Sequence, residues 1–236
     1  KLNIQKVYDL QNSSRTKFYK SILFPSANFN TWSSSETTLP SNTSKEEFDK
    51  KPVLNRFEHQ LKISGLDTQN TMMPNFSWSC TNIDNIKNNN KLREYIVLFP
   101  FCSAHLDVKK WSYYNELIEL IKNKFNDRYK VVVAPGPSEI NDAKNINAVL
   151  ILDQNKALNI SQLSTLIKES SFVVANDTGP AHMSAHLGVK GLALFGKHTT
   201  AFKVSIERKN FKAIQVDDLS KLSAEKVFER IFGILN

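Results

Sequence analysis

From Tyr95 to the end of the chain, short unbroken runs of apolar residues alternate with segments that have the spacing of amphipathic helices. A run of about four to eight apolar residues bounded by polar turns is typical of a strand that is buried on both faces. Such strands, when helices separate them, form a parallel sheet covered on both sides. The predicted strands are 96–99, 129–134, 149–152, 172–175, 191–195 and 213–216, and the predicted helices are 111–125, 160–170 and 223–234.

Residues 1–80 follow no such regular pattern. We expect a strand at 7–10 and a helix at 17–22 in this part of the chain. Ser44 followed by Glu47 resembles a capping box, which predicts one helix from there to about Ile63. The expected domains are a partial N-terminal domain over 1–80, a linker over 81–93 and a ligand-binding C-terminal domain over 94–236.

Composition and charge narrow the class of protein. The formal net charge is +8 at pH 7, which favours acidic partners such as nucleotide phosphates, lipid headgroups or nucleic acid. A composition bias toward lysine and asparagine explains the charge equally well. The sequence has no nucleic-acid-binding motif and no apolar run of the roughly 18–20 residues that span a bilayer. Cys80 and Cys102 have neither metal-ligand nor disulfide-framework spacing, so we expect a reducing, cytoplasmic location.

Ligands of such parallel sheets bind beyond the carboxyl ends of the strands, where three polar turns follow predicted strands. The first turn, 99–111, carries Ser103 and Lys109. A lysine there can neutralise phosphate charge, although an exposed loop with solvated lysines is the alternative. The second turn carries Glu139, a carboxylate that either accepts hydrogen bonds from ribose hydroxyls or merely stabilises the first turn of a helix.

The third turn lies between a predicted strand and a short helix closed by Gly188. It runs from Asn176 to His182, and a helix N-terminus at this place presents N–H groups to a phosphate or a sugar oxygen. Asp177 is expected to accept hydrogen bonds from sugar hydroxyls or from backbone donors, to cap the helix, or to do both. His182 and His186 have the i,i+4 spacing that also occurs in zinc sites. Because no third ligand is near them in the sequence, we predict no metal.

These turns occur in the same order in a known family. Residues 177–182, Asp-Thr-Gly-Pro-Ala-His, are similar to the D-T-G-x-x-H signature of glycosyltransferase family 9, the ADP-heptose:lipopolysaccharide heptosyltransferases. Residues 188–196 resemble the following segment of the family, where a strand ends in F/Y-G. Residues 109–111 look like its K-x-W, Glu139 falls in a G-x-x-E turn, and residues 8–15 resemble an earlier strand and turn. Together the similarities cover nearly the whole chain.

The resemblance implies a GT-B fold, in which two Rossmann-like domains face each other across a cleft. The chain would then contain a complete C-terminal domain for an ADP-sugar and a partial N-terminal domain for the acceptor. The implied activity is metal-independent, inverting transfer of a heptose or related sugar to the lipopolysaccharide core, with no cofactor besides the donor substrate. The implied partners are an ADP-heptose-like donor, the anionic lipopolysaccharide core and, peripherally, the inner face of the cytoplasmic membrane, but no nucleic acid.

The resemblance also implies roles for individual residues. Lys109 would contact the donor phosphates, Glu139 the adenosine ribose, and Asp177 the donor at the cleft. Lys109 and Asp177 are therefore the candidate catalytic residues. The other expected substrate-binding residues are Ser103, His105, Thr178, Gly179, Pro180 and His182.

Two departures from the family pattern bear on these expectations. Residues 101–105 read Phe-Cys-Ser-Ala-His where many members have a Pro-Gly-Ser-Ser type of loop, which leaves the preferred sugar open. Nothing in residues 1–80 matches the Gly-Asp turn whose aspartate is the family's proposed base, so we expect the base in a segment that precedes Lys1 in a longer protein. Two other functions stay open, namely another GT-B sugar-nucleotide enzyme, such as a UDP-sugar transferase or epimerase, and a non-catalytic nucleotide-sugar-binding module.

Overall fold

The computed structural model describes residues 4–26, 30–103, 106–126 and 128–235. The chain divides into two compact units. The first consists of Lys1–Pro74 with Phe202–Ser205, and the second of Asn75–Ala201 with Ile206–Asn236.

The boundary between the units precedes the segment 81–93 that we expected to be a linker. That segment contains helix α4 (Asp84–Asn89), in which Ile86 is buried. The N–H of Thr81 donates to Thr165 Oγ1 at 2.9 Å, and the Thr165 hydroxyl donates to the Thr81 carbonyl at 2.6 Å. These contacts make the segment part of the second unit.

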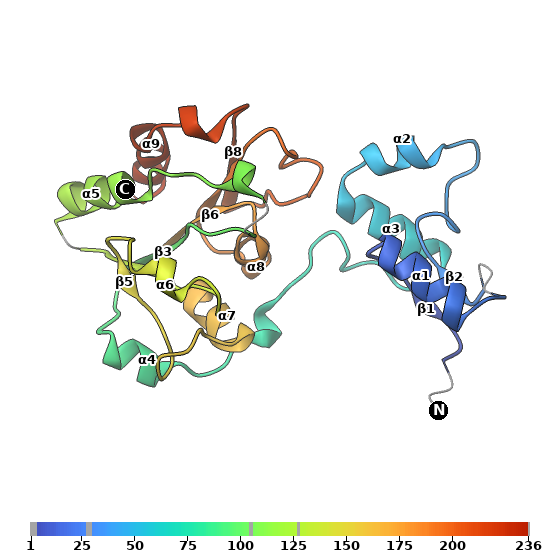
Figure 1. Ribbon diagram of the computed structural model, residues 1–236, viewed down its shortest axis with the longest axis horizontal. Helices are drawn as coiled ribbons and strands as arrows, with labels where there is room; N and C mark the ends of the chain where they lie inside the picture. The colour runs from blue at the N-terminus through green and yellow to red at the C-terminus, as the bar shows by residue number, and fades with distance from the viewer. Residues whose placement is uncertain (1–3, 27–29, 104–105, 127, 236) are drawn as a thin grey trace. The chain divides into compact units, whose positions relative to one another are not determined.

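Six parallel strands form the sheet of the second unit, in the order β5-β4-β3-β6-β7-β8 (Figure 1). The chain enters the sheet at β3, proceeds outward to β5, and then crosses to β6 on the other side of β3. The α/β class predicted from the apolar runs is therefore confirmed. The strands are β3 (Tyr95–Phe99), β4 (Lys130–Val133), β5 (Val149–Leu150), β6 (Phe172–Asn176), β7 (Gly191–Phe195) and β8 (Phe211–Gln215).

Helices cover both faces of this sheet (Figure 1). On one face α5 (Tyr114–Phe125) packs against α9 (Ala224–Leu235), and on the other α7 (Ile160–Lys168) packs against α8 (Gly179–Leu187). Right-handed crossovers require this arrangement, because the strand order runs in opposite directions on the two sides of β3. The remaining helical segments of the unit are α6 (Ile140–Ala143) and the 3₁₀ turns η1 (Ser77–Ser79), η2 (Asp107–Lys109) and η3 (Leu219–Lys221).

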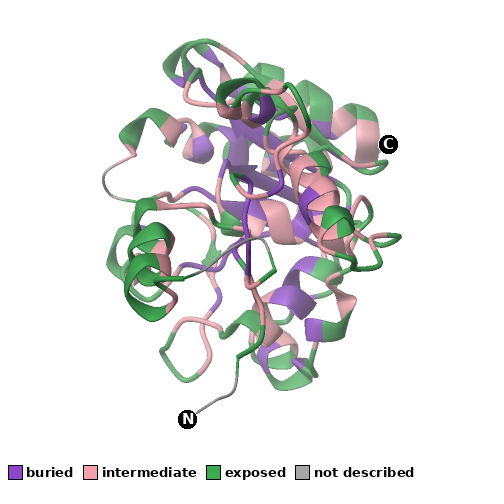
Figure 2. Cartoon of the chain, turned by 90° about the vertical axis from the view of Figure 1, so that its right-hand side faces the viewer, coloured by how far each residue is buried: buried purple, intermediate pink, exposed green. Residues whose placement is uncertain are grey.

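The core of the second unit lies on both sides of the sheet, as its unbroken apolar strands predicted. All residues of β3, β6 and β7 are buried, and Figure 2 shows the strands in the colour of buried residues. Leu98 and Val174 face the cluster that includes Ile121 of α5 and Val227 of α9. Burial of such side chains supplies the main stabilisation of the unit, at about 25 cal/mol per Å² of apolar surface.

The single helix that we expected from Ser44 to Ile63 is two helices, α2 (Lys45–Lys50) and α3 (Val53–Ile63). The predicted capping box is present, since the Glu47 N–H donates to Ser44 Oγ at 3.2 Å and the Ser44 N–H to Glu47 Oε2 at 3.1 Å. Pro52 explains the break. A proline disfavours the helical conformation of the residue before it, and Lys51 is extended, with φ −69° and ψ 154°.

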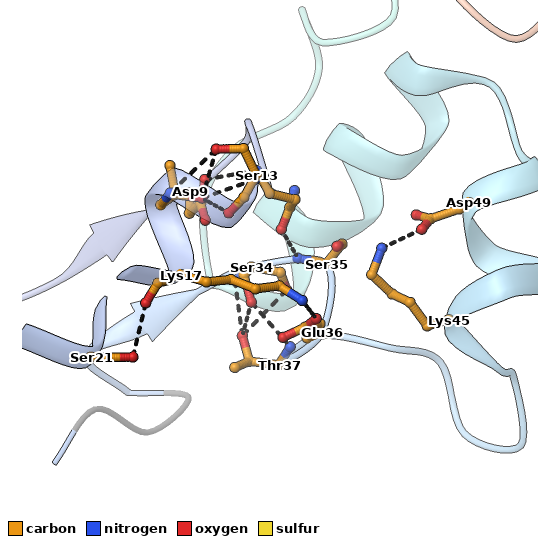
Figure 3. A network of polar contacts seen from close by, with 12 residues as sticks. Asp9, Ser13, Lys17, Ser21, Ser34, Ser35, Glu36, Thr37, Lys45 and Asp49 are labelled. Carbon is orange, nitrogen blue, oxygen red and sulfur yellow. Dashed lines mark hydrogen bonds and ion pairs between the residues drawn. The ribbon is translucent and has the colours of Figure 1, made fainter. Parts of the chain in front are cut away.

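The first unit contains α1 (Ser14–Leu23) and a parallel pair of short strands, β1 (Val7–Tyr8) and β2 (Trp32–Ser33). An ion pair of 2.5 Å joins Lys17 of α1 to Glu36, which follows β2 (Figure 3). This ion pair is exposed and connects α1 to the segment that follows β2.

A buried glutamine connects the same strands to α3. The Nε2 of Gln60 donates to the carbonyls of Asp9 at 3.0 Å and Ser33 at 3.1 Å, and the side chain of Gln60 is fully buried. In the first unit, this buried polar contact adds to the packing of the buried side chains of Trp32 and Phe48. Across the described residues of both units, no helix has the length and apolar character needed to cross a bilayer.

Candidate nucleotide-sugar site

A pocket of about 440 Å³ lies where the strand order reverses, beyond the carboxyl ends of β3 and β6. Parallel sheets bind their ligands at such switch points, because the connections leave the two strands in opposite directions and open a crevice between them. The turns after β3, β4 and β6 all contribute to the pocket wall. These are the three turns that carry the site residues predicted from the sequence.

A buried asparagine at the end of β6 ties these turns together. The Nδ2 of Asn176 donates to the Pro100 carbonyl at 2.8 Å. Its Oδ1 accepts from the Tyr114 hydroxyl at 3.2 Å and from the Trp111 N–H at 3.4 Å. Asn176 is fully buried, so these bonds replace the water that its amide loses on folding. They fix the next residue, Asp177, beside the loop that follows β3.

Asp177 is surrounded by nitrogen atoms from separate segments of the chain. Its Oδ2 lies 2.7 Å from Lys109 Nζ and 2.9 Å from His198 Nε2. Its Oδ1 lies 3.6 Å from His182 Nε2, which is longer than an ordinary hydrogen bond and is a weaker polar contact. Lys109 ends η2, His182 lies on α8, and His198 follows β7. The Asp177 side chain is only 5% exposed.

These contacts determine the charge of the carboxyl group. Burial alone would raise the pKa of Asp177, but the polar contacts with His182, Lys109 and His198 outweigh it and hold the pKa well below its ordinary range. Asp177 is therefore ionised at neutral pH. An ionised carboxylate with so low a pKa accepts hydrogen bonds and orients cations, but it is a poor proton acceptor.

The position of Lys109 leaves part of its ammonium group available to a ligand. An ammonium has three N–H donors, and Nζ contacts Asp177 Oδ2 at 2.7 Å and the Asp177 carbonyl at 3.4 Å. Among the described residues no other acceptor contacts Nζ, so the remaining N–H is available to a ligand in the pocket that Lys109 lines. Because the carboxylate already orders the lysine, less side-chain entropy is lost when a ligand binds.

The carboxylate of Glu139 folds back over its own turn. Its Oε2 accepts from the Gly136 N–H at 2.7 Å, and the Glu139 N–H donates to the Gly136 carbonyl at 3.0 Å. A Cβ atom at Gly136 would lie 3.2 Å from Oε2, closer than ordinary van der Waals contact. The glycine thus lets the carboxylate approach, and the remaining lone pairs of Glu139 are available to hydroxyl groups in the pocket.

The first turn of α8 forms another part of the wall. Thr178 is the N-cap residue of α8, so Asp177 does not cap this helix. The first N–H groups of a helix lack intrahelical acceptors and lie at the positive end of its dipole. Thr178 and Gly179 line the pocket. Pro180 has no N–H, and the Ala181 N–H donates to the Thr178 carbonyl at 3.0 Å, so the N–H of Gly179 is the first-turn donor at the edge of the pocket. Leu158, Leu163 and Pro135 supply an apolar section of the same wall.

Most of the site residues predicted from the sequence meet in this pocket. His182 instead contacts Asp177 from α8 and is not part of the pocket wall, and His105 lies outside the described residues. The predicted residues that line the pocket are Ser103, Lys109, Glu139, Asp177, Thr178, Gly179 and Pro180.

The histidine pair on α8 does not form a metal site with other residues. Among the described residues, no three His, Cys, Asp or Glu side chains come together as they would around a metal ion. Burial, with Arg208 and His182 nearby, lowers the pKa of His186 to about 4. His186 is consequently neutral at pH 7, and the metal independence of the implied transfer stays a prediction.

Sequence reasoning missed His198 and the apolar section of the wall. One signal was available for His198, because β7 pairs with β6 and the turns that follow paired parallel strands lie side by side. The apolar residues Leu158 and Leu163 flank Asn159, which caps α7. Nothing in their local pattern distinguishes them from residues that pack the helix onto the sheet.

Comparisons with known proteins bear on the family and the fold of the chain. The sequence profile of glycosyltransferase family 9 (heptosyltransferase) matches residues 33–230. The fold is similar to that of E. coli heptosyltransferase WaaC with ADP, with a TM-score of 0.60 and 21% identity over 78% of this chain and 57% of that one. It is also similar to a family 9 glycosyl transferase from Veillonella parvula DSM 2008, with a TM-score of 0.60 and 16% identity over 84% and 61% of the two chains.

A third similar structure is the E. coli ADP-heptose lps heptosyltransferase II, with a TM-score of 0.54 and 19% identity over 64% of this chain and 50% of that one. At these identities the likeness establishes the fold. The chain spans about half to three-fifths of the length of the solved structures it matches. Comparison with curated protein sequences gives no match.

Proposed function

The chain belongs to glycosyltransferase family 9, the heptosyltransferase family, and we propose that its switch-point pocket binds the ADP portion of an ADP-heptose-like donor. The observation that carries the proposal is the meeting of Lys109, Glu139 and the start of α8 around one pocket. A cation and a helix N-terminus suit a diphosphate. A carboxylate beside an apolar wall suits a ribose and its base.

The parts of the ligand can be assigned to parts of the wall. The base lies against the apolar section formed by Leu158, Leu163 and Pro135, and the ribose hydroxyls donate to Glu139. The diphosphate then lies between the free N–H of Lys109 and the first turn of α8. The proposal leaves the sugar at the mouth of the pocket, where a second substrate can reach it.

The proposed reaction is glycosyl transfer with inversion. An acceptor hydroxyl forms a bond to the anomeric carbon on the side opposite the diphosphate, the bond from that carbon to the phosphate oxygen breaks, and ADP leaves with both electrons. Negative charge grows on the diphosphate as this bond breaks. Lys109 and the α8 dipole are aimed at that charge, and donors of this kind can contribute several kcal/mol to a transition state, by order of magnitude.

The acceptor hydroxyl must also lose a proton, and neither carboxylate of the pocket suits that role. Asp177 has a strongly lowered pKa, and Glu139 is bound to the Gly136 N–H. We therefore assign the general base to a carboxylate outside this pocket, on the acceptor side. The first unit belongs to the acceptor side in this proposal, the acceptor is the anionic lipopolysaccharide core, and transfer takes place at the cytoplasmic face of the membrane.

The nucleotide part of the proposal is tested by competition. A fluorescent ADP derivative is bound to the chain and displaced with ADP or UDP. We expect ADP to compete at least about tenfold better, because a pyrimidine covers less of the apolar wall and about 1.4 kcal/mol corresponds to a factor of ten. Equal displacement by the two nucleotides would favour a UDP-sugar enzyme, and displacement by neither would contradict nucleotide binding at this site.

A further inference from the structure

His198 contacts the nucleotide pocket only through another residue. It follows the end of β7, and its Nε2 lies 2.9 Å from Asp177 Oδ2. Its ring stacks on that of Phe195 at a centroid distance of 6.1 Å and an interplanar angle of 11°. The side chain is 10% exposed. His198 is therefore a mostly enclosed residue, and its polar contact among the described residues is with the carboxylate that holds Lys109.

The contact defines the tautomer of the imidazole. Ionised Asp177 can only accept hydrogen bonds, so Nε2 of His198 must carry the hydrogen. The other ring nitrogen, Nδ1, is buried and has no hydrogen-bond partner among the described residues. A second N–H buried there would lack an acceptor, at a cost in free energy. The geometry thus fits a ring that donates from Nε2 to Asp177.

Two donors from different loops converge on one oxygen. Lys109 Nζ and His198 Nε2 both lie within hydrogen-bond distance of Asp177 Oδ2. A carboxylate rotates about its last side-chain bond with broad freedom. His198, which follows β7, holds Oδ2 from a second side and removes this freedom, so the carboxylate that binds the lysine is fixed.

We propose that His198 is a positioning residue of the nucleotide site, whose Nε2–H fixes Asp177 so that the carboxylate keeps Lys109 directed to the diphosphate. The inference rests on the proposed function, because it concerns the same lysine and the same ligand. It assigns to the turn after β7 a role in donor binding although His198 itself does not line the pocket. The stack on Phe195 offers a different explanation, in which His198 only stabilises the core.

Two variants separate these explanations. His198→Gln retains an N–H donor near the position of Nε2 but loses the aromatic stack, whereas His198→Phe retains a stacking ring but loses the donor. We expect His198→Phe to bind ADP about tenfold more weakly, the order expected for loss of a hydrogen bond to a charged group. We expect His198→Gln to stay within about threefold of the original affinity. Isothermal titration calorimetry with ADP measures both.

Equal ADP affinity of the two variants would overturn the proposal, whether both bind tightly or both bind weakly. His198→Ala also lacks the donor, so the proposal requires it to bind ADP as weakly as His198→Phe does. It replaces His198→Phe in the comparison if that variant does not fold. His59 offers a matched control, since its Nε2 lies 2.8 Å from the Thr38 carbonyl and its ring packs against Phe48. His59→Phe should leave ADP affinity unchanged.

Failure of this inference can be distinguished from failure of the proposed function. If the unaltered chain does not bind ADP, or if Lys109→Ala binds it equally well, the nucleotide site itself is wrong. If Lys109→Ala loses affinity while His198→Phe retains it, the site stands and the role of His198 is refuted. In an Asp177→Asn background, His198→Phe should have a much smaller effect on ADP affinity, because the carboxylate that it positions is gone.

Discussion

Lys109→Ala is expected to weaken ADP binding by about ten- to a hundredfold. The ammonium is held at the pocket by Asp177 at 2.7 Å and retains an N–H for the diphosphate. A hydrogen bond to a charged group contributes about 1.5–3 kcal/mol, and each 1.4 kcal/mol is a factor of ten. Calorimetric titration of the variant with ADP measures the loss directly. Raising the salt concentration should reduce the difference in ADP affinity between the unaltered chain and Lys109→Ala, because salt screens the charge of a partly exposed lysine.

The neighbouring lysine provides the control for this substitution. Lys110 has the same chemistry and lies one residue away, but it is exposed and does not line the nucleotide pocket. Lys110→Ala should therefore bind ADP with nearly the original affinity. A comparable loss in both variants would mean that general positive charge, and not the placed ammonium of Lys109, attracts the nucleotide. Circular dichroism at the titration temperature verifies that each variant is folded.

Gly191→Ala is expected to lower the stability of the second unit severely. A Cβ atom at Gly191 would lie 2.6 Å from the Phe211 ring and 2.7 Å from the Val173 carbonyl, both shorter than any ordinary contact. Gly191 begins β7, which is buried throughout, so the neighbours cannot yield easily. Overpacking of this kind costs about 1–3 kcal/mol or more. For a domain of this size, that corresponds to a fall of roughly 3–10 °C in the melting temperature.

A second glycine gives the opposite prediction. Gly233 lies in α9, and a Cβ atom there would meet nothing within 4 Å. Gly233→Ala should raise the stability by up to about 1 kcal/mol, because alanine favours a helix more than glycine does. Thermal unfolding of both variants distinguishes the two effects. An unchanged melting temperature of Gly191→Ala would show that β7 does not pack against β8 as closely as the structure indicates.

The arrangement of the second unit could be predicted from the sequence because its signals are strong and local. Apolar strands such as 96–99 and 172–175 are buried on both faces, and their pattern implies a parallel sheet. Once the sheet is parallel, the polar turns after its strands must lie at one edge. The sequence alone therefore predicts that Lys109, Glu139 and Asp177 lie near one another.

Other features depend on contacts that no local pattern records. The Thr81 and Thr165 pair makes 81–93 part of a folded unit, and it joins residues 84 positions apart. Contact between His198 and Asp177 likewise depends on how the turn after β7 returns across the sheet edge. The helix break at Pro52 is different, because a proline is a local signal that predicts a break. The capping box at Ser44 correctly predicted the start of a helix but not where that helix ends. The lowered pKa of Asp177 could not be inferred either, because it depends on burial and on distances to groups from other segments.

The central claim is that ADP occupies the pocket between β3 and β6, and a crystal structure of this chain with ADP tests it most directly. The account predicts electron density for the diphosphate between Lys109 Nζ and the first turn of α8. It predicts the ribose beside Glu139 and the base against Leu158 and Leu163. Density for ADP at any other place on the chain, with this pocket filled only by solvent, would contradict the account.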